Sequence, residues 1–405
     1  MAKDRSLQEA KAPRVVVAPD SFKGSLTAAE VAGAIAEGLS LVWPDAQMTL
    51  LPLSDGGEGW VETIVTAAGG RRVTESVTGP LGAPVEATYG LIELPEGPGA
   101  VIEMASASGL HLIDRSTADP RRTTTYGTGE LIVRALDRGV RRLLVGIGDS
   151  ATNDGGAGLA EALGVRLLDA GGARLGPGGT ELARLERVDL SSIDRRVREM
   201  EVLVASDVDN PLTGEHGASA VFGPQKGASP EVVAELDAAL AHFADKVEAE
   251  VGRTARDEPG AGAAGGLGFG LMMFCDVLVR PGIELSLDAV GADAAFEAAD
   301  LVITGEGRID AQTLRGKAPV GVARRAQRFG VPVVAIAGSI GPLDDDLAGD
   351  LRAAGISVVC PIIEEPSEPH DVMDPEATVH RLRRTARRIA GLIDIGRILR
   401  GEERG

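Results

Sequence analysis

The chain has 405 residues, a formal net charge of −19 and 44% hydrophobic residues. This length exceeds one ordinary domain and the apolar content is sufficient for cores, so we expect two domains. The negative charge, the absence of a basic stripe and an aromatic content of only 3% argue against a nucleic-acid partner or an acidic membrane surface.

The first residues and the cysteines bear on cellular location. Residues 1–12 contain no apolar segment and are expected to form a flexible tail. No run of about 18 apolar residues, the length that predicts a membrane-spanning helix, occurs in the sequence. Cys275 and Cys360 lie far apart in apolar surroundings, which favours free thiols in a reducing compartment. We therefore expect a cytoplasmic protein.

The first predicted unit is RVVVAPDSFKGSLT, at residues 14–27. It reads as a buried strand, a polar glycine turn and the start of a helix, for which Thr27 and Glu30 have the spacing of a capping box. Lys23 and Ser21 lie in the turn, beside backbone N–H groups that suit an anion. An ordinary strand-to-helix turn with a solvated lysine is the alternative.

Strands and helices then alternate along the chain. Further strands are expected at 48–53, 100–103, 142–147, 202–205, 301–304, 333–337 and 358–362. Helices are expected at 27–41, 60–68, 127–137, 156–163, 230–251, 286–299, from 317 onward, and at 376–399. Residues 72–93 alternate in polarity between turn signals and predict a hairpin-like pair.

The two ends of the chain share one pattern and the middle has another. We therefore expect an α/β fold with two domains. A discontinuous, doubly wound (flavodoxin-like) parallel-sheet domain is predicted from residues 13–75 and 285–400, and an inserted second α/β domain from residues 76–284.

Four predicted strand ends carry a loop that combines glycine with acidic or amide side chains. These loops contain Asp55 and Glu58; Asn153 and Asp154; Asp207, Asp209 and Asn210; and Glu306 and Asp310. In open parallel sheets ligands bind beyond the carboxyl ends of the strands, and carboxylates there could hold Mg²⁺. Each loop could instead be an Asx turn or a helix N-cap.

Lysine is rare in this chain, with six among the 41 basic residues. Three of the six have a glycine neighbour, namely Lys23, Lys226 and Lys317. An ammonium group beside an exposed backbone amide is typical of phosphate binding. Surface lysines beside turn glycines are the alternative.

Several well-known motifs are missing or out of context. The sequence has no GxxxxGK[ST], HExxH, CxxC or GxSxG, which argues against a Walker-type phosphate loop, a zinc site and a serine hydrolase. A GxGxxG occurs at residues 260–265, but it follows Pro259 rather than a strand, so a dinucleotide site is not indicated.

Ten ordered motifs from about residue 15 to 389 resemble the bacterial class I glycerate kinase family. They are PDSFKGS, SDGGEG, EMASASGL, TTTYGTGELI, SATNDGG, DVDNPL, FGPQKGA, PGAGAAGGLG, TGEGRID and GKAPVGVA. Three positions depart from the family pattern: Asp149 stands where the family usually has the second of two glycines, Ser54 where it usually has alanine, and Trp60 where it often has threonine.

The resemblance implies an ATP- and Mg²⁺-dependent kinase that phosphorylates D-glycerate, generally giving 2-phosphoglycerate. It also implies two α/β domains with the site between them. The expected partners are glycerate and ATP, without nucleic acid or membrane, and a homodimer is compatible with this interpretation. A kinase for another hydroxy acid and a non-catalytic sensor of small organic acids are the alternatives.

The hypothesis for the site depends on cationic side chains and Mg²⁺ offsetting the negative charge of the protein and its substrates. The catalytic candidates are Asp207, Lys23, Lys317 and Asp55. The nucleotide-binding candidates are Lys226, Asn153, Asp154, Gly155, Gly305 and Glu306. The substrate-binding candidates are Ser21, Ser106, Ser108 and Arg308. The metal-ligand candidates are Asp207 and Asp310, and Asp207 is the first choice for metal ligation or for accepting the hydroxyl proton.

Overall fold

The structure is a computed structural model that describes residues 12–57, 59–94, 97–116, 118–341, 345–363 and 372–399. Glu58 and almost all of the predicted tail, residues 1–11, lie outside the described residues. The chain forms two compact units: unit 1 is Met1–Ser54 with Leu287–Gly405, and unit 2 is Asp55–Ser286.

Unit 1 contains one parallel sheet built from both ends of the chain. Its strands are β1 (Arg14–Pro19), β2 (Gln47–Leu50), β11 (Leu301–Ile309), β12 (Val333–Ile340) and β13 (Ile356–Pro361). They lie in the order β13-β12-β11-β1-β2, and every neighbouring pair is parallel. This is the 2-1-3-4-5 order of flavodoxin-like sheets, so the predicted doubly wound fold is confirmed.

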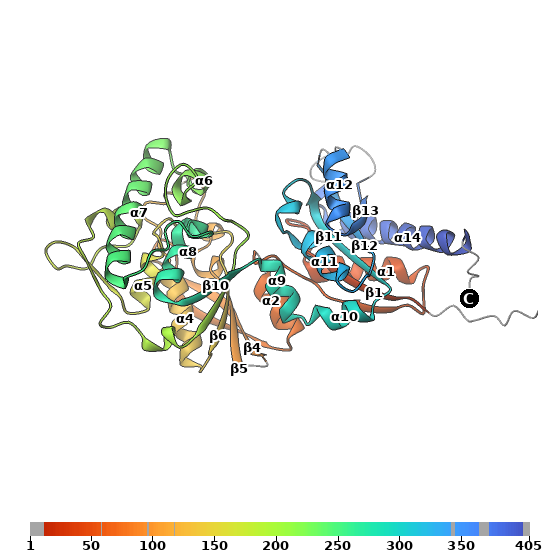
Figure 1. The fold of residues 1–405 in the computed structure, drawn as a ribbon, viewed down its shortest axis with the longest axis horizontal. Coiled ribbons are helices and arrows are strands. Elements are labelled where there is room, and N and C mark those ends of the chain that lie inside the picture. The colour runs from red at the N-terminus through yellow and green to blue at the C-terminus, as the bar shows by residue number, and fades with distance from the viewer. Residues whose placement is uncertain are drawn as a thin grey trace, which may run out of the picture. The chain divides into compact units, whose positions relative to one another are not determined.

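Helices surround this sheet, and Figure 1 shows the red N-terminal elements of unit 1 among its blue C-terminal ones. They are α1 (Ala28–Ser40), α10 (Ala292–Ala298), α11 (Ala318–Gln327), α12 (Asp345–Ala353) and α14 (Pro375–Leu399). The predicted capping box starts α1, since Thr27 Oγ1 accepts a bond from Glu30 N and the Glu30 carboxylate accepts one from Thr27 N. Apolar side chains from α1 and α14 share one buried cluster with those of β1 and β11.

Unit 2 contains a larger mixed sheet. Its strands are β3 (Arg71–Thr78), β4 (Pro84–Leu94), β5 (Gly97–Glu103), β6 (Arg142–Gly146), β9 (Glu201–Ala205) and β10 (Asp276–Arg280). They lie in the order β10-β9-β6-β5-β4-β3. The first four are parallel, while β4 is antiparallel to both β5 and β3. A small antiparallel pair, β7 (Arg166–Leu168) and β8 (Arg187–Asp189), lies elsewhere in the unit.

The helices of unit 2 are α2 (Trp60–Ala67), α3 (Ala105–Ser108), α4 (Tyr126–Asp137), α5 (Ala157–Ala162), α6 (Ala218–Phe222), α7 (Pro230–Val251) and α8 (Ala263–Phe274). The remaining helix, α9 (Gly282–Ala289), contains the border between the units. The GxGxxG sequence at residues 260–265 runs into the start of α8, and the element before it is α7 rather than a strand, so the context that a dinucleotide motif requires is absent at this place.

The border between the units differs from the predicted one. The sequence places it after residue 75, where a hairpin-like pattern begins. In the structure residues 55–75 belong to unit 2, because β3 pairs with β4 and α2 packs on β4 and β5. The change of pattern therefore marks the antiparallel strands inside one sheet. The chain passes from unit 1 to unit 2 earlier, after Ser54.

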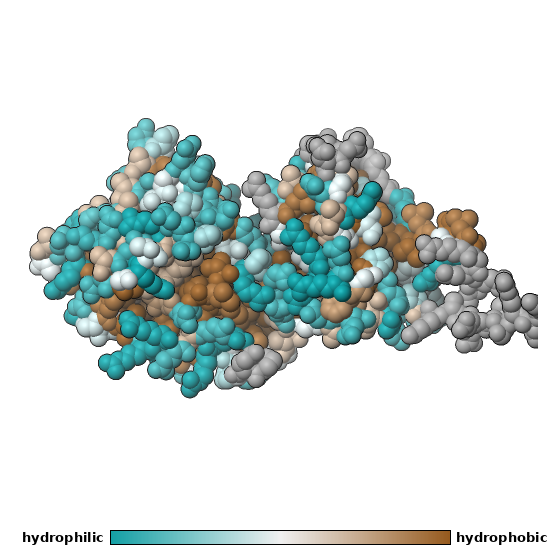
Figure 2. Space-filling view, in the orientation of Figure 1, coloured by the Kyte–Doolittle hydropathy of each residue, from teal (hydrophilic) through white to brown (hydrophobic). Residues whose placement is uncertain are grey.

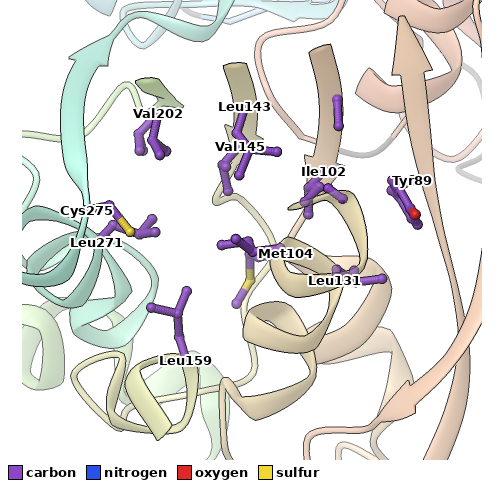
Figure 3. Packing of buried hydrophobic residues seen from close by; sticks show 14 of the residues in the cluster. Tyr89, Ile102, Met104, Leu131, Leu143, Val145, Leu159, Val202, Leu271 and Cys275 are labelled. Atoms are coloured by element: carbon purple, nitrogen blue, oxygen red, sulfur yellow. The ribbon is translucent and has the colours of Figure 1, made fainter. Parts of the chain in front are cut away.

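The main core of unit 2 is shown in Figure 3. Buried side chains of the sheet, including Tyr89, Ile102 and Val145, converge with Leu131 of α4 and Leu271 of α8. This packing holds the four parallel strands at a common level, which matters for the site described below.

Both cysteines are free thiols, as expected. Burial raises the pKa of the Cys275 thiol to about 12, so this side chain behaves as a small apolar core residue.

The face shown in Figure 2 is mostly hydrophilic, with hydrophobic residues gathered over the middle of unit 2 and near the end of α14. The exposed apolar side chains there are Leu392, Ile395, Ile398 and Leu399. Among the described residues, none of the helices combines the length and the apolar character needed to cross a membrane.

Candidate active site

In unit 1 the predicted residues gather at the carboxyl ends of β1 and β11. These neighbouring strands continue to opposite sides of the sheet, so their ends form the switch point at which open α/β sheets bind ligands. The two strands stay in register to the end of β1, where Pro19 lies beside Gly305 and Asp20 N donates to Gly305 O at 2.8 Å. The turn that carries Ser21 and Lys23 therefore begins directly beside Glu306.

Glu306 is a buried carboxylate with a cationic neighbour. It is 5% exposed, and it lies in β11, which is longer than predicted and continues to Ile309. Its Oε1 accepts a hydrogen bond from Thr313 Oγ1, and its Oε2 lies 4.0 Å from Lys317 Nζ. Since Lys317 is the N-cap of α11, its ammonium group stands at the positive end of that helix. This arrangement suits a phosphate group.

The Lys23 turn lies close to the same strand. A Cβ atom on Gly307 would stand 3.6 Å from Lys23 N, so the turn runs directly past β11. Gly24 has φ +81°, which a side chain would strain, and the Lys23 side chain is exposed. The structure thus brings Lys23, Glu306 and Lys317 to one edge of unit 1.

Asp310 and Arg308 contact each other just after this edge. Arg308 Nε donates to Asp310 Oδ2 at 3.0 Å, and Asp310 Oδ1 accepts from Gln312 N at 2.9 Å. The second bond closes an Asx turn, which is the alternative the sequence left open for this loop.

In unit 2 four strands end at the same level. Glu103 of β5, Gly146 of β6, Ala205 of β9 and Arg280 of β10 are register partners across the sheet. Residues 55–57 cross this carboxyl edge: a Cβ on Gly56 would lie 2.9 Å from the Ala205 Cβ.

Three carboxylates belong to this edge of unit 2. Asp55 lies in the crossing segment, Asp149 follows β6, and Asp207 follows β9. Asp207 is exposed, and its Oδ1 accepts a hydrogen bond from Gly282 N at 3.2 Å. The sequence reasoning missed Gly282, which is one glycine among 54 and belongs to no motif.

The predicted nucleotide-binding loop at 153–155 is buried instead of facing solvent. Asp154 accepts hydrogen bonds from Thr125 N and Oγ1 at 2.8 and 2.9 Å, and from Gly156 N and Gly158 N at 3.2 Å. Burial raises the pKa of the Asp154 carboxyl, and the bonds from Thr125 oppose that shift. Both oxygens therefore anchor the start of α5, so we correct the interpretation of Asp154 as a direct nucleotide ligand.

Asn153 and Gly155 are equally enclosed. Asn153 Nδ2 donates to Ser219 Oγ at 2.8 Å in a fully buried contact. Gly155 has φ +65°, and a Cβ there would lie 2.9 Å from the Phe243 ring. Gly155 therefore serves close packing, and the Asn153 amide nitrogen is bonded to Ser219. The buried Oδ1 of Asn153 has no hydrogen-bond partner within the described part of the chain.

Lys226 is also buried, with 1% exposure. Its Nζ donates to Ser150 Oγ and to Thr152 O, both at 2.7 Å. Burial lowers the pKa of Lys226 to about 7, although the field of Asp154 acts to raise it. The adjacent glycine had suggested a phosphate-binding lysine in an exposed turn, but the side chain points into the unit.

Ser106 and Ser108 shape the turn after β5. Ser106 Oγ donates to Glu103 O at 2.8 Å, and the fully buried Ser108 Oγ shares a hydrogen bond of 2.9 Å with Thr128 Oγ1. The Ser108 hydroxyl is therefore enclosed, which contradicts its predicted contact with a substrate.

Asp149 has a left-handed backbone, with φ +54°, where glycine is favoured. We expect Asp149→Gly to leave the free energy of unfolding within about 1 kcal/mol of wild type, because relief of strain offsets the greater freedom of the unfolded chain. Asp149→Ala should destabilise by about 1 kcal/mol or more, because alanine lacks the polar side chain that helps aspartate tolerate this conformation. Urea denaturation of wild type, Asp149→Gly and Asp149→Ala measures their free energies of unfolding. An alanine variant as stable as the glycine variant would contradict the prediction.

Comparison with known proteins places the chain in a family. The model of the glycerate kinase family matches residues 15–394. A glycerate kinase of Bacillus subtilis (strain 168) is 49% identical over 389 residues, which cover 95% of this chain and 99% of that protein. A glycerate 2-kinase of Escherichia coli (strain K12) is 47% identical over 350 residues, covering 86% and 90%.

A solved structure agrees with these matches. A chain assigned to glycerate kinase 2 in Salmonella typhimurium LT2 superimposes with a TM-score of 0.84 at 48% sequence identity, covering 95% of this chain and 99% of that one. Relatives at about half identity over nearly the whole length identify an enzyme of the kinase class. The chain belongs to the glycerate kinase family.

Proposed function

We propose that this enzyme transfers the γ-phosphoryl group of ATP to D-glycerate, at the 2-hydroxyl, giving 2-phospho-D-glycerate. The observation that carries the proposal is the family match over residues 15–394 together with relatives named glycerate kinase and, in one case, glycerate 2-kinase. The charged groups at the two carboxyl edges provide the chemistry that such a transfer needs, which is positioning and charge neutralisation.

In unit 1, Lys23 and Lys317 would hold the phosphate groups. The first amides of α11 add partial positive charge beside Lys317. Glu306 orients Lys317 from behind, because its carboxylate is buried, bonded to Thr313 and 4.0 Å from the ammonium group. A positioned cation of this kind stabilises charge that develops on the transferring group.

In unit 2, Asp207 and Asp55 would serve the metal and the acceptor hydroxyl. No group of three or more His, Cys, Asp or Glu side chains among the described residues is arranged to hold a metal ion. Mg²⁺ in kinases needs fewer protein ligands, since one or two carboxylates with substrate phosphates and waters suffice, so the exposed Asp207 fits this ion. When bound, Mg²⁺ neutralises phosphate charge. Asp207 or Asp55 would accept the proton of the hydroxyl group.

The product identifies the reaction directly. Incubation of the purified protein with ATP, Mg²⁺ and D-glycerate, followed by ³¹P and ¹H NMR, should show ADP and a phosphate ester coupled to the C2 proton. Coupling to the C3 protons would show phosphorylation at the other hydroxyl. A panel of other small hydroxy acids tests the alternative acceptor, and glycerate binding without ADP formation would indicate a sensor.

Lys317→Met should lower kcat/KM by about 10²- to 10³-fold, the usual effect of removing one positioned donor from a developing anion. Arg324→Met is the matched control, because Arg324 is an exposed cation in the last turn of the same helix. Lys317→Met also leaves the buried Glu306 carboxylate without its cationic neighbour, which could lower stability. The double variant with Glu306→Gln removes that carboxylate charge, so an activity loss that persists in it comes from the missing lysine. Normal turnover in Lys317→Met would remove this lysine from the site.

A further inference from the structure

A buried lysine lies directly behind the hydroxyl group of Ser150. Lys226 ends a short 3₁₀ turn at Pro224–Lys226, and its Nζ reaches Ser150 Oγ and Thr152 O at 2.7 Å each. With 1% exposure Lys226 cannot itself contact a ligand in solution. Ser150 keeps 8% exposure and follows the exposed Gly148 and Asp149 after β6, so it is the member of the pair nearer to solvent.

The contact determines which way the Ser150 hydroxyl hydrogen points. A charged lysine has three donors and no acceptor, so it can only donate to Ser150 Oγ. The Ser150 hydrogen must then point away from Lys226, and it makes no other hydrogen bond with the described part of the chain. A serine held in this way is an oriented donor with a positive charge behind it.

We infer that Ser150, backed by Lys226, donates a hydrogen bond to an anionic oxygen of a carboxylate or phosphate group bound at the carboxyl edge of the unit 2 sheet. The inference deepens the proposed function, because the anion would belong to one of the kinase's own substrates. It gives Lys226 the role of a positioning residue that acts through Ser150.

The charge of Lys226 makes this donor sensitive to pH. Burial lowers the pKa of Lys226 to about 7, while the nearby Asp154 carboxylate raises it. Below this pH the lysine is charged and Ser150 donates outward. Above it the neutral amine can accept the Ser150 hydrogen, and the outward donor is lost. A bound anion favours the charged lysine, so its affinity should fall as pH rises through the pKa, by up to about tenfold per unit.

Isothermal titration of the full-length protein at several pH values between about 6 and 9 tests this inference. D-Glycerate is the carboxylate probe and sulfate stands in for phosphate, since neither changes its charge over this range. In wild type we expect affinity for at least one probe to fall above about pH 7, with proton uptake on binding. Ser150→Ala should lower that affinity at pH 6 by about 10- to 100-fold, as for the loss of a hydrogen bond to a charged group.

Variants at Lys226 complete the test. Lys226→Met should weaken the same probe and remove the pH dependence, whereas Lys226→Arg, which stays charged, should remove the pH dependence while keeping more of the affinity. Lys246→Met is the matched control in the same unit, because its ammonium group pairs with Glu186 at 3.1 Å. Thermal unfolding of each variant identifies any that fails to fold. If the Lys226 variants do not fold, the affinity of Ser150→Ala for the two probes is the test of the inference.

The probe that responds identifies the group bound: glycerate alone indicates a carboxylate, and sulfate alone a phosphoryl group. Wild-type affinity of Ser150→Ala for both probes would overturn the inference. If sulfate binding depends on Ser150 while no glycerate is phosphorylated, the donor stands and the proposed function fails. If glycerate is phosphorylated while the affinity for neither probe depends on Ser150, the proposed function stands and the inference about Ser150 fails.

Discussion

Replacing Asp207 with asparagine should lower kcat by about 10²- to 10⁴-fold, the range expected when a positioned acid–base group is lost. Asp207 follows β9 at the carboxyl edge of unit 2 and is exposed there. Asparagine keeps an Oδ1 acceptor for Gly282 N, 3.2 Å away, and replaces the charged second oxygen with a neutral NH2 group of similar size. The fold should therefore survive, with a melting temperature close to that of wild type.

Steady-state kinetics at several Mg²⁺ concentrations distinguish the two roles considered for Asp207. If it binds the metal, activity of Asp207→Asn should recover partly at high Mg²⁺. If it accepts the hydroxyl proton, activity should stay low at saturating Mg²⁺. Asp276→Asn is the control, because Asp276 is an exposed carboxylate at the opposite end of the neighbouring strand β10. An Asp207→Asn enzyme as active as wild type would exclude Asp207 from the reaction.

The fold could be predicted from sequence because its signals are local. Runs of Val, Ile and Leu predicted the sheet of unit 1 and most strands of the main sheet of unit 2, and Thr27 with Glu30 predicted the start of α1. β7, β8 and β10 were missed, because all three are short, and β10 is also partly exposed although its DVLVR sequence holds three consecutive apolar residues. The border after Ser54 was also missed, since the crossing segment has the same glycine-rich pattern as a ligand loop.

The site was predictable only in part, because sequence shows which residues follow strands but not which way they point. Lys317 and Lys226 each have a glycine neighbour, yet the first side chain is partly exposed at a helix start and the second is buried against Ser150. Asp154 and Asp207 both follow a strand, yet Asp154 is enclosed by four donors while Asp207 is exposed. Burial by residues distant in sequence decides these cases, and no local pattern reports it.

Gly282→Ala should disrupt the carboxyl edge of unit 2 more than any other glycine substitution at this edge. A Cβ on Gly282 would stand 1.7 Å from Asp55 O and 2.4 Å from the Asp55 carbonyl carbon. Both are backbone atoms, so a side-chain rotation cannot relieve the clash. The segment at Asp55 must move away from the strand ends, or α9 must shift with Gly282 N, which donates to Asp207. We expect a loss of about 1–3 kcal/mol or more in the free energy of unfolding, as for overpacked cores.

The chain offers a local reporter for this displacement. It has two tryptophans, and Trp60 Nε1 donates to Ser286 Oγ of α9 at 2.8 Å in a buried contact. In a Trp43→Phe background, Gly282→Ala should shift the Trp60 emission to longer wavelength, because movement of α9 breaks this bond and admits water. Gly176→Ala is the control, since a Cβ there meets only the Glu181 side chain at 3.5 Å. Unchanged Trp60 emission and stability in Gly282→Ala would show that the Asp55 segment moves aside without a loss in the free energy of unfolding. The placement of Asp55 beside Asp207 would then no longer depend on close packing against Gly282.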